Sequence, residues 1–480
     1  MRIVVDPDRM AAYKALVRIE KSRAYSNIEL NMILESRAGS DKPAGKKDRG
    51  GAKGGDEIVN PSFVRELVYG VVRNRRYLDY YIDTLAKNGI ESIRKEVAVL
   101  LETGIYQIVF MDSVPAHSAV DETVKIAKLL FPGRDGFVNG LLRSFLRKFY
   151  DFGDAPVPDN ADKISLRPVP DIADDIDRMS VTYSCDEGLV RLIAGQYGKD
   201  DEEEILRVSL ETPPLFVHVN TIKTSSAELV SSLRGQGFRA DIFADINSDI
   251  NLDITADTKN DDILVVSGRG ILETEEFREG KFFVQDASSG MAIKEFRPEA
   301  GEVLIDVCAA PGGKTFAAAM EMENIGVIHA MDLHGNKLRA LQKEAKRLGI
   351  RIIDTEEHDA KTVHEEYRGA ADKVLCDVPC SGLGVLRRKP EIKDRPLLND
   401  GRGLAEIQYR ILEASSEYVK PGGDLMYSTC TINKIENEEV TDRFLREHAD
   451  FEERCSRHIM PCSGGPDGFY YCIMKRRQGI

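Results

Sequence analysis

From Gly301 onward the sequence alternates between short apolar runs and amphipathic stretches, and this alternation restricts the fold more than any other feature. A strand followed by a helix and a further strand predicts a mostly parallel sheet with helices on both faces, here a Rossmann-like α/β domain over 301–480. Ligands of such sheets bind where the strands end. The predicted elements are strand Val303–Val307, a helix from Lys314, strand Val327–Met331, helix Asn336–Leu348, strand Arg351–Ile353, strand Lys373–Cys376, helix Leu404–Tyr418 and strand Asp424–Ser428.

Residues 1–150 have the pattern of an all-α bundle. Between Phe63 and Tyr81, apolar residues recur at the helical period, and Arg73, Arg75 and Arg76 follow the stripe. Pro115 and Ser118 predict the start of another helix, because Ser118 and Asp121 have the spacing of a capping box. A third helix, Phe137–Phe149, has an apolar face opposite Arg143 and Arg147. Those arginines fit a solvated surface as well as they fit contact with RNA.

Two segments of biased composition divide the chain. Residues 38–57 are rich in Gly and Lys without apolar periodicity, which predicts a disordered loop inside the helical domain. Residues 151–180 hold four prolines among many aspartates and predict an acidic linker. Residues 181–300 then predict a small α+β RNA-binding subdomain, from the strand-like runs 215–220, 238–243 and 263–266 and the helix-like run 226–233.

Charge and cysteine usage limit the class of protein. The net charge of -14 disfavours a polyanionic partner for the chain as a whole, but residues 1–150 hold 25 Lys and Arg against 19 Asp and Glu. This excess of 6 positive charges makes the helical domain compatible with RNA. The eight cysteines are too sparse for a disulfide framework, and no apolar run reaches membrane-span length. We therefore expect a cytoplasmic protein with free thiols.

A loop of small residues follows the first predicted strand, between Asp306 and Thr315. Small residues let a ligand approach the backbone at a helix N-terminus. A phosphate-binding loop would require Gly at the position of Cys308, and the spacing of a dinucleotide loop is also absent. The loop therefore predicts a nucleoside-binding site.

Three aspartates follow successive strands of this domain. Asp332 stands 20 residues after Gly312, the separation at which a carboxylate accepts hydrogen bonds from a ribose, and Asp359 and Asp377 end the next two strands. One such aspartate is usually a cap or a turn residue. Three of them beside a Gly-rich loop predict a pocket for S-adenosylmethionine.

Two cysteines also follow strands. Cys380 follows the predicted strand Lys373–Cys376, and Cys430 stands at the end of the next predicted strand. Carbon 5 of cytosine is too weak a nucleophile to attack a sulfonium methyl group, but addition of a thiolate at carbon 6 makes it reactive. Zinc is disfavoured because Cys376 and Cys380 have no second close pair beside them, and we predict no metal site.

These motifs resemble a known family. The strings DVCAAPGGKT, DVPCSGLGVLRRKPEIK and YSTCTINKIENEE are similar to those of the Nop2/Sun family of RNA cytosine-5 methyltransferases. The strings FVRELVYGVVRNRRYLD, PAHSAVDETVKIAK and GFVNGLLRSFLRK resemble the NusB-like RNA-binding domain of its bacterial Sun/Fmu branch. The resemblance implies a methyltransferase acting on a cytosine of small-subunit (16S) ribosomal RNA, with S-adenosyl-L-methionine as cofactor.

The resemblance also assigns roles to residues. It implies that Asp332 and Asp359 bind the ribose and adenine, that Asp377 lies between cofactor and cytosine, that Cys430 is the nucleophile, and that Cys380 helps the product to leave. Tyr183-Ser184-Cys185-Asp186 departs from the family's usual Tyr-Ser-His-Pro, and the insertion at 38–57 is a second departure. The implied cofactor loop comprises Cys308, Ala309, Ala310, Pro311, Gly312, Gly313 and Lys314.

Two other functions are compatible with parts of the sequence. A DNA cytosine-5 methyltransferase would use Cys380 as the nucleophile, but Cys430 in its Ser-Thr-Cys-Thr strand end and the NusB-like domain disfavour it. A non-catalytic ribosome assembly factor would need neither the pocket nor the two cysteines. We infer no obligate protein partner and expect a monomer.

Overall fold

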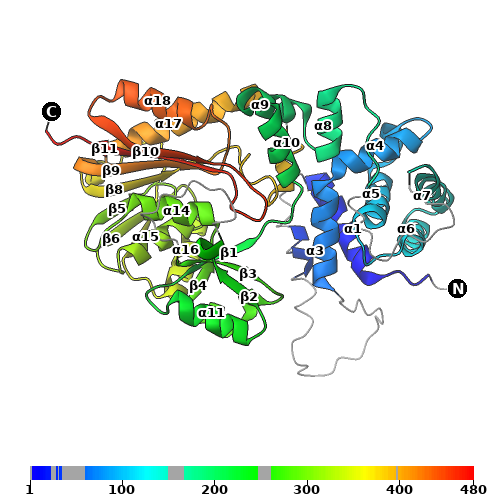
Figure 1. Cartoon of the computed structure of the whole chain (residues 1–480), viewed down its shortest axis with the longest axis horizontal. Helices are drawn as coiled ribbons and strands as arrows, with labels where there is room; N and C mark the ends of the chain where they lie inside the picture. Colours follow the sequence, from blue (N-terminus) through cyan, green and yellow to red (C-terminus); the bar gives the residue numbers. More distant parts are fainter. Residues whose placement is uncertain are drawn as a thin grey trace. The chain divides into compact units, whose positions relative to one another are not determined.

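The computed structural model describes residues 3–22, 29–30, 32–34, 60–149, 167–246, 261–395 and 398–479. The chain divides into two compact units: Met1–Arg191 with Lys389–Pro396, and Leu192–Arg388 with Leu397–Ile480 (Figure 1). The loop predicted at 38–57 and residues 151–166 of the predicted linker lie outside the described residues. Across these described ranges, no helix has the length and hydrophobicity needed to cross a membrane.

The first unit is all-α, as the sequence predicts. Its core forms around α5, which is buried along most of its length, and the apolar stripe of α3 packs into that core through Val64, Leu67, Val68 and Val71. Helix α9 begins in the first unit and ends in the second. The helices are α1 Pro7–Ser22, α3 Pro61–Arg73, α4 Arg75–Leu85, α5 Lys95–Phe110, α6 Ala116–Leu130, α7 Asp135–Phe149, α8 Asp175–Tyr183 and α9 Glu187–Tyr197.

Two local predictions in this unit are wrong. The stripe does not continue through one helix, because Asn74 leaves the helical conformation (φ -114°, ψ 19°) and separates α3 from α4. Its side-chain Nδ2 donates to the carbonyl of Gly70 (2.9 Å), a local bond that competes with helix continuation. Ser118 does not cap α6 either. That helix begins at Ala116, directly after Pro115, and has no side-chain cap.

After the end of α9, the second unit contains α10 (Lys199–Val208) and a four-stranded antiparallel sheet in the order β2-β3-β1-β4. This confirms the predicted α+β fold. The strands are β1 Leu215–Val219, β2 Arg239–Ile242, β3 Ile263–Ser267 and β4 Phe282–Val284. Helix α11 (Ser226–Gly235) starts with a capping box between Ser225 and Glu228. The sequence did not predict β4, because three residues are too few to reveal a period.

The remainder of this unit contains a seven-stranded sheet in the order β10-β11-β9-β8-β5-β6-β7 (Figure 1). All strands from β5 to β9 pair in parallel, and β11 is antiparallel to both of its neighbours, so the predicted mostly parallel sheet is confirmed. The strand order reverses between β5 and β8, which leaves a crevice at their carboxyl ends. The strands are β5 Val303–Asp306, β6 Val327–Asp332, β7 Ile353–Glu357, β8 Ala371–Asp377, β9 Val419–Thr429, β10 Phe451–Ile459 and β11 Phe469–Arg476.

Helices cover both faces of this sheet. On one face, α14 (Ala287–Phe296), α15 (Gly313–Glu321) and α16 (Gly335–Leu348) share a core with Leu304 and Met426. On the other, α17 (Arg402–Ser416) and α18 (Glu438–Glu447) pack against Ile305 and Tyr427. Neighbouring residues of one strand thus enter different cores, as the pleat requires.

The edges of this sheet differ from the predictions. The third parallel strand was expected at Arg351–Ile353 but spans Ile353–Glu357, an edge strand with few buried residues. Strands β10 and β11 were not predicted from the sequence. Strand β10 has polar residues on most of its length, and β11 is a continuous buried run without alternation, so neither has the pattern of a half-buried strand.

Candidate active site

The loop between β5 and α15 holds the predicted cofactor residues from Cys308 to Lys314. The backbone N–H of Ala309 donates to the carbonyl of Met331 on β6 (2.8 Å), which fixes the loop over the neighbouring strand. Gly312 has φ +116°, and a Cβ there would lie 2.4 Å from the Phe316 ring, so only glycine fits. Because α15 begins at Gly313, the unbonded N–H groups of its first turn face this loop.

A buried carboxyl group accepts hydrogen bonds from both ends of this loop. Asp306 ends β5 and is 1% exposed; it accepts the hydroxyl of Thr315 (2.7 Å) and the backbone N–H of Cys308 (3.3 Å). Burial raises the pKa of Asp306 to about 7, although the bond from Thr315 opposes the shift. Asp306 is not among the predicted site residues, although the sequence places it at the end of a predicted strand.

Asp332 and Asp359 stand at the carboxyl ends of neighbouring strands. Asp332 ends β6, is 8% exposed and accepts the backbone N–H of His334 (2.9 Å). Asp359 follows β7 and accepts the backbone N–H of Lys361 (3.1 Å). Partial burial opposes ionisation of Asp359, but the N–H and ammonium of Lys361 outweigh it and lower the pKa of this carboxyl group.

Asp377 links the cofactor loop to the strands that carry the cysteines. One carboxylate oxygen accepts the Ser428 hydroxyl (2.8 Å), and the other lies 2.9 Å from Lys314 Nζ. The Lys314 ammonium also lies 4.8 Å from the centre of the Phe469 ring. Burial opposes its charge, but Asp377 and then Cys430 outweigh this and raise the pKa of Lys314. The lysine therefore stays a cation beside both groups.

The two predicted cysteines lie in contact. Cys380 follows β8, Cys430 follows the neighbouring strand β9, and their sulfur atoms are 3.2 Å apart as free thiols. The bond to Cys430, and burial after it, raise the pKa of Cys380 well above its ordinary value. The parallel pairing of β8 with β9 brings these thiols together from positions 50 residues apart in the chain.

A buried carboxylate outside the predicted site residues holds the two cysteine loops in place. Glu436 is fully buried and accepts the backbone N–H of Ser381 (2.9 Å), the Gln408 amide (3.0 Å) and the Asn433 amide (3.0 Å). It therefore bonds to one residue next to Cys380 and to another close to Cys430. No spacing rule distinguishes Glu436 from the other acids of the NKIENEE segment.

The chemistry of these groups fits S-adenosylmethionine. The carboxylates at the ends of β6 and β7 can accept from ribose and adenine, and the glycine at 312 lets a ligand approach the backbone. One buried donor near the loop, Gln285 Nε2, has no hydrogen-bond partner within the structure's described part. Among the described residues, no cluster of three or more His, Cys, Asp or Glu side chains could hold a metal ion.

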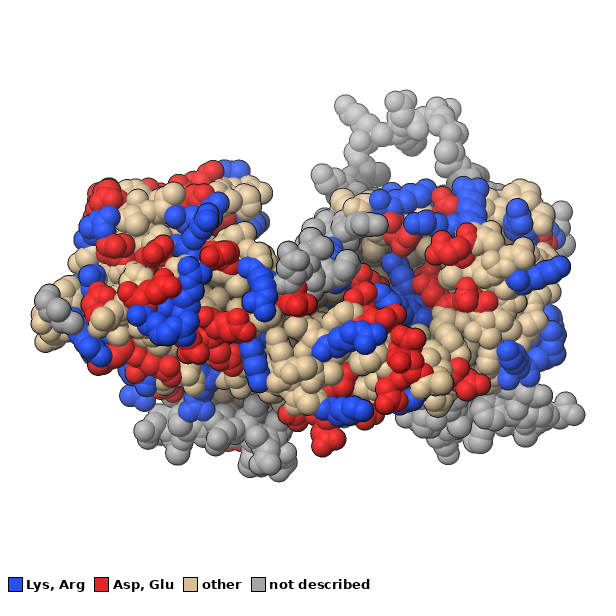
Figure 2. Space-filling view, turned by 90° about the horizontal axis from the view of Figure 1, so that it is seen from above, with Lys and Arg blue, Asp and Glu red and all other residues tan. Residues whose placement is uncertain are grey.

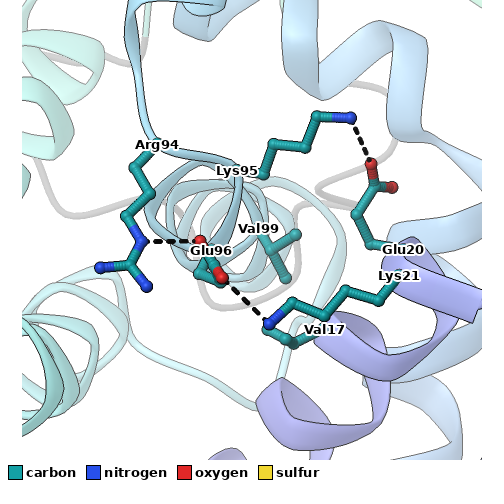
Figure 3. Close-up of a pocket in the computed structure, with 7 residues that line it drawn as sticks. All are labelled: Val17, Glu20, Lys21, Arg94, Lys95, Glu96 and Val99. Atoms are coloured by element: carbon teal, nitrogen blue, oxygen red, sulfur yellow. Dashed lines mark hydrogen bonds and ion pairs between the residues drawn. The ribbon is translucent and has the colours of Figure 1, made fainter.

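Charged residues of the first unit provide a second candidate surface. A pocket of about 470 Å³ lies between α1 and α5 (Figure 3). Its cations are already paired: Lys21 and Arg94 contact Glu96 (3.0 and 2.8 Å), and Lys95 contacts Glu20 (3.5 Å). The described residues that line the pocket include no cysteine, serine or histidine, and its three cations face two carboxylates, so we do not regard it as a catalytic site.

The arginines that follow the stripe of α3 point inward. Arg73 is 8% exposed, Arg75 contacts Glu20 (2.9 Å), and Arg76 contacts Asp186 (2.8 Å). In contrast, Arg143 and Arg147 on α7 are exposed, and among the described residues their side chains bond to neighbours on their own helix. On the face drawn in Figure 2, Lys and Arg are interspersed with Asp and Glu. The exposed cations of α7 are thus the better candidates for phosphate contacts.

The sheet order, the loop at its switch point and the carboxylates at the strand ends define the second unit as a Rossmann-like methyltransferase. The family model described as 16S rRNA methyltransferase RsmB/F matches residues 293–474, and the model of the NusB family matches residues 6–147. The chain belongs to the RsmB/F methyltransferase family and carries a NusB-family domain at its N-terminal side. The predicted resemblance to the Sun/Fmu branch is therefore confirmed.

Relatives match over most of the chain. The chain is 33% identical to the probable ribosomal RNA small subunit methyltransferase B of Bacillus subtilis over 98% of both proteins. It is 28% identical to ribosomal RNA small subunit methyltransferase B of Vibrio cholerae, covering 87% of this chain and 89% of the relative. The crystal structure of PH0851 has a TM-score of 0.75 at 21% identity, with 99% and 100% coverage, which supports the fold.

Proposed function

We propose that this protein transfers a methyl group from S-adenosylmethionine to carbon 5 of a cytosine in 16S ribosomal RNA, in the cytoplasm. Membership of the RsmB/F family and the names of its relatives support ribosomal RNA as the substrate. The observation that carries the cytosine-5 chemistry is the pair of thiols 3.2 Å apart, beside a carboxylate that bonds to the cofactor loop. Within this proposal, Cys308–Lys314, Asp332 and Asp359 bind the cofactor, which supplies an electrophilic methyl group.

Cys430 is the nucleophile in this mechanism. Its thiolate adds to carbon 6 of cytosine and shifts electron density toward the ring nitrogen. Lys314 supports this step, because the same attraction that raises the pKa of Lys314 beside Cys430 also stabilises a negative sulfur. Asp377, held by Ser428 and Lys314, is oriented to hydrogen-bond the cytosine edge where the charge shifts.

Cys380 completes the reaction. Once Cys430 is bonded to carbon 6, the hydrogen bond with Cys430 that raises the pKa of Cys380 no longer exists. After methyl transfer, the Cys380 thiolate takes the proton from carbon 5, the double bond between carbons 5 and 6 re-forms, and Cys430 leaves as a thiolate. The proton then passes from Cys380 to solvent. The 3.2 Å distance between the two sulfurs supports this role, because it leaves Cys380 beside the adduct that Cys430 would form.

A denaturing gel with radiolabelled 16S RNA tests the assignment of the two cysteines. Cys430→Ala should form no covalent species and transfer no methyl group. Cys380→Ala should still add to the base but release it slowly, and should accumulate an RNA adduct. Cys455→Ala is the matched control, because this half-buried thiol lies on β10, away from the site. An adduct that appears only in Cys430→Ala would instead support the DNA-type mechanism with Cys380 as the nucleophile.

A further inference from the structure

The last turn of α9 contacts the loop that follows the proposed nucleophile. This loop runs from Cys430, at the end of β9, to Asn437, the residue before α18. Gln196 and Tyr197 are the last two residues of α9, and both are half-buried against residues 432–434 of the loop. The two residues and the loop all lie within the second unit.

The amide of Gln196 bridges two residues of the loop, and backbone groups fix its orientation. Its Oε1 accepts the backbone N–H of Lys434 (3.1 Å), and a backbone N–H can only donate. Its Nε2 therefore faces Asn433 and donates to Oδ1 (2.8 Å). The Asn433 amide is fixed in the same way, because its Nδ2 donates to the carbonyl of Asp400 (2.8 Å). Asn433 is 1% exposed, so the bond from Gln196 is shielded from water and correspondingly strong.

The hydroxyl of Tyr197 holds the loop at a second point. It donates to the carbonyl of Ile432, two residues after Cys430. Its oxygen lies 3.2 Å from Nε2 of His458 on β10, and His458 Nδ1 lies 2.9 Å from the Glu438 carboxylate. Burial raises the pKa of Tyr197, and the charge of Glu438 adds to this shift. The hydroxyl therefore keeps its proton and remains a donor to the carbonyl.

The loop in turn contributes a cation to the end of the helix. Lys434 Nζ donates to the backbone carbonyl of Gln196 (2.8 Å), which belongs to the last turn, where a helix leaves its carbonyls without an internal partner. The same ammonium group lies 4.6 Å from the centre of the Tyr197 ring. The end of α9 is thus bonded to three consecutive residues of the loop.

Through Asn433 this contact extends to both cysteine loops. Asn433 Nδ2 also donates to one carboxylate oxygen of Glu436 (3.0 Å), and the other oxygen accepts the backbone N–H of Ser381, next to Cys380 (2.9 Å). A misplacement of about 1 Å can slow a reaction about 100-fold. Bonds that begin at Gln196 therefore bear on the placement of both thiols.

We propose that Gln196 and Tyr197 are positioning residues for the nucleophile: the end of α9 fixes the loop after Cys430 so that the thiolate meets carbon 6 of the base. This inference rests on the proposed function, since it takes Cys430 as the nucleophile. In this role neither residue contacts the base or the cofactor. They therefore act on the rate of thiol addition and not on the binding of either substrate.

Covalent trapping on RNA that contains 5-fluorocytidine tests this role. The thiolate adds to carbon 6 and carbon 5 takes the methyl group, but carbon 5 then carries fluorine in place of the proton that must leave, so the adduct persists. The full-length protein is mixed with S-adenosylmethionine and with 16S RNA transcribed with 5-fluorocytidine. The experiment measures the rate of trapping and the fraction of protein trapped, and mass spectrometry of the digested adduct identifies the linked cysteine.

Two variants remove the bonds to the loop. Gln196→Met keeps the size of the side chain and removes its hydrogen bonds, and Tyr197→Phe removes only the hydroxyl. Each should slow trapping about 10-fold, with the trapped fraction, the KM for RNA and the affinity for S-adenosylhomocysteine as in the wild type. Gln236→Met is the matched control: this amide lies at the exposed end of α11, bonds to Glu276 (2.7 Å), and should leave the trapping rate unchanged.

Each outcome leads to a different conclusion. If the residues only stabilise the fold, the variants trap a smaller fraction of protein at the wild-type rate, and the inference is wrong. It is also wrong if both variants trap at the wild-type rate, or if S-adenosylhomocysteine binding weakens in step with the rate, which would indicate a distorted pocket. If thermal melting shows that Gln196→Met does not fold, Tyr197→Phe alone decides.

Failure of the proposed function gives a distinct result, because it appears in the wild type. If the wild type forms no adduct, or if the adduct is linked to Cys380, the assignment of Cys430 as nucleophile is wrong, and this inference falls with it. Trapping at Cys430 in the wild type with an unchanged rate in both variants would overturn this inference alone.

Discussion

Asp306 is a single residue that connects the central sheet to the loop proposed to bind the cofactor. The carboxyl group accepts from Thr315 on α15 and from the backbone of Cys308, so it bonds to both ends of the loop. Burial nevertheless raises the pKa of Asp306 to about 7; the bond from Thr315 opposes this shift, and the nearby charge of Asp377 adds to it. Ionisation of Asp306 near neutral pH therefore costs stability.

We predict that Asp306→Asn removes a pH dependence of folding. A carboxyl group whose pKa is higher in the folded state stabilises the fold at low pH, and that contribution is lost as pH rises from about 4 to about 7. Relative to the variant, the wild type should therefore lose up to about 1.4 kcal/mol of unfolding free energy per pH unit in this window. Urea titrations followed by circular dichroism at pH 4.5, 6 and 7.5 measure this difference. Parallel pH profiles would contradict the assignment.

The site residues that the sequence predicts share one property: each follows a strand. Parallel strands end at the same edge of a sheet, so Asp332, Asp377 and Cys430 could be placed together without any coordinates. Glu436 and Gln196 could not. Their importance depends on which backbone or side-chain groups they face after folding, and neither spacing nor residue type reveals these partners.

At the scale of elements, the bounds of buried strands were predicted more accurately than those of exposed strands. The central strands are apolar on both faces and were placed to within a few residues, whereas the edge strand β7 was displaced because its sequence, IDTEE, is mostly polar. The break at Asn74 was not predicted, because the apolar stripe of α3 ends at Val72 and does not show where the helix stops. A local side-chain bond to Gly70, and not the hydrophobic pattern, ends α3 there.

The loop after Cys380 shows how tightly elements approach at the site. The backbone N–H of Gly384 donates to the carbonyl of Cys430 (3.1 Å), and the carbonyl of Gly384 accepts the N–H of Gly468 (2.9 Å). A Cβ at position 384 would lie 2.1 Å from the carbonyl oxygen of Gly468. Only glycine therefore allows these three loops to meet.

We predict that Gly384→Ala separates the loops and displaces Cys430. Overpacking of this kind should lower the free energy of unfolding by about 1–3 kcal/mol and reduce methyl transfer. The effect on cofactor affinity should be small, because the atoms nearest to a Cβ at position 384 belong to Gly468 and Cys430 and not to the loop at 308–314. Urea unfolding, a methyl-transfer assay and calorimetry measure the three quantities.

Gly403→Ala is the control for this change. No atom lies within 4 Å of a Cβ at position 403, and the residue is in helix α17, where alanine is about 1 kcal/mol more favourable than glycine. That variant should be as active as the wild type and no less stable. Full activity in Gly384→Ala would show that the thiols do not depend on this contact.

At the scale of the whole molecule, one segment belongs to a different unit from the chain on either side of it. Lys389–Pro396 follows the loop of Cys380 in sequence but packs within the first unit. There the Lys393 carbonyl accepts the N–H of Asp186 (2.8 Å), and Lys393 Nζ donates to the carbonyl of Arg73 (3.2 Å). Burial lowers the pKa of Lys393 to about 8. No periodicity in the sequence could predict this placement, because it depends on contacts more than 200 residues apart in the chain.

Arg76 links this segment to the helices of the first unit. Its side chain contacts Asp394 within the segment (3.2 Å) and Asp186 just before α9 (2.8 Å). We predict that Arg76→Ala loosens the segment and lets trypsin cut after Lys393, which is 1% exposed in the wild type. Loss of two partly buried ion pairs should increase the cleavage rate about 10-fold, because proteolysis depends on local opening. It should also slow methyl transfer, since the segment is continuous with the loop that carries Cys380.

Arg143→Ala provides the comparison for this test, because Arg143 is exposed on α7 and its side chain bonds only to Asn139, four residues earlier. It should leave cleavage after Lys393 at the wild-type rate, which mass spectrometry of the fragments measures directly. If Arg76→Ala and Arg143→Ala are cleaved alike, the ion pairs of Arg76 do not hold the segment. Faster cleavage with undiminished methyl transfer would mean that the segment is docked by Arg76 but that the Cys380 loop keeps its geometry without it.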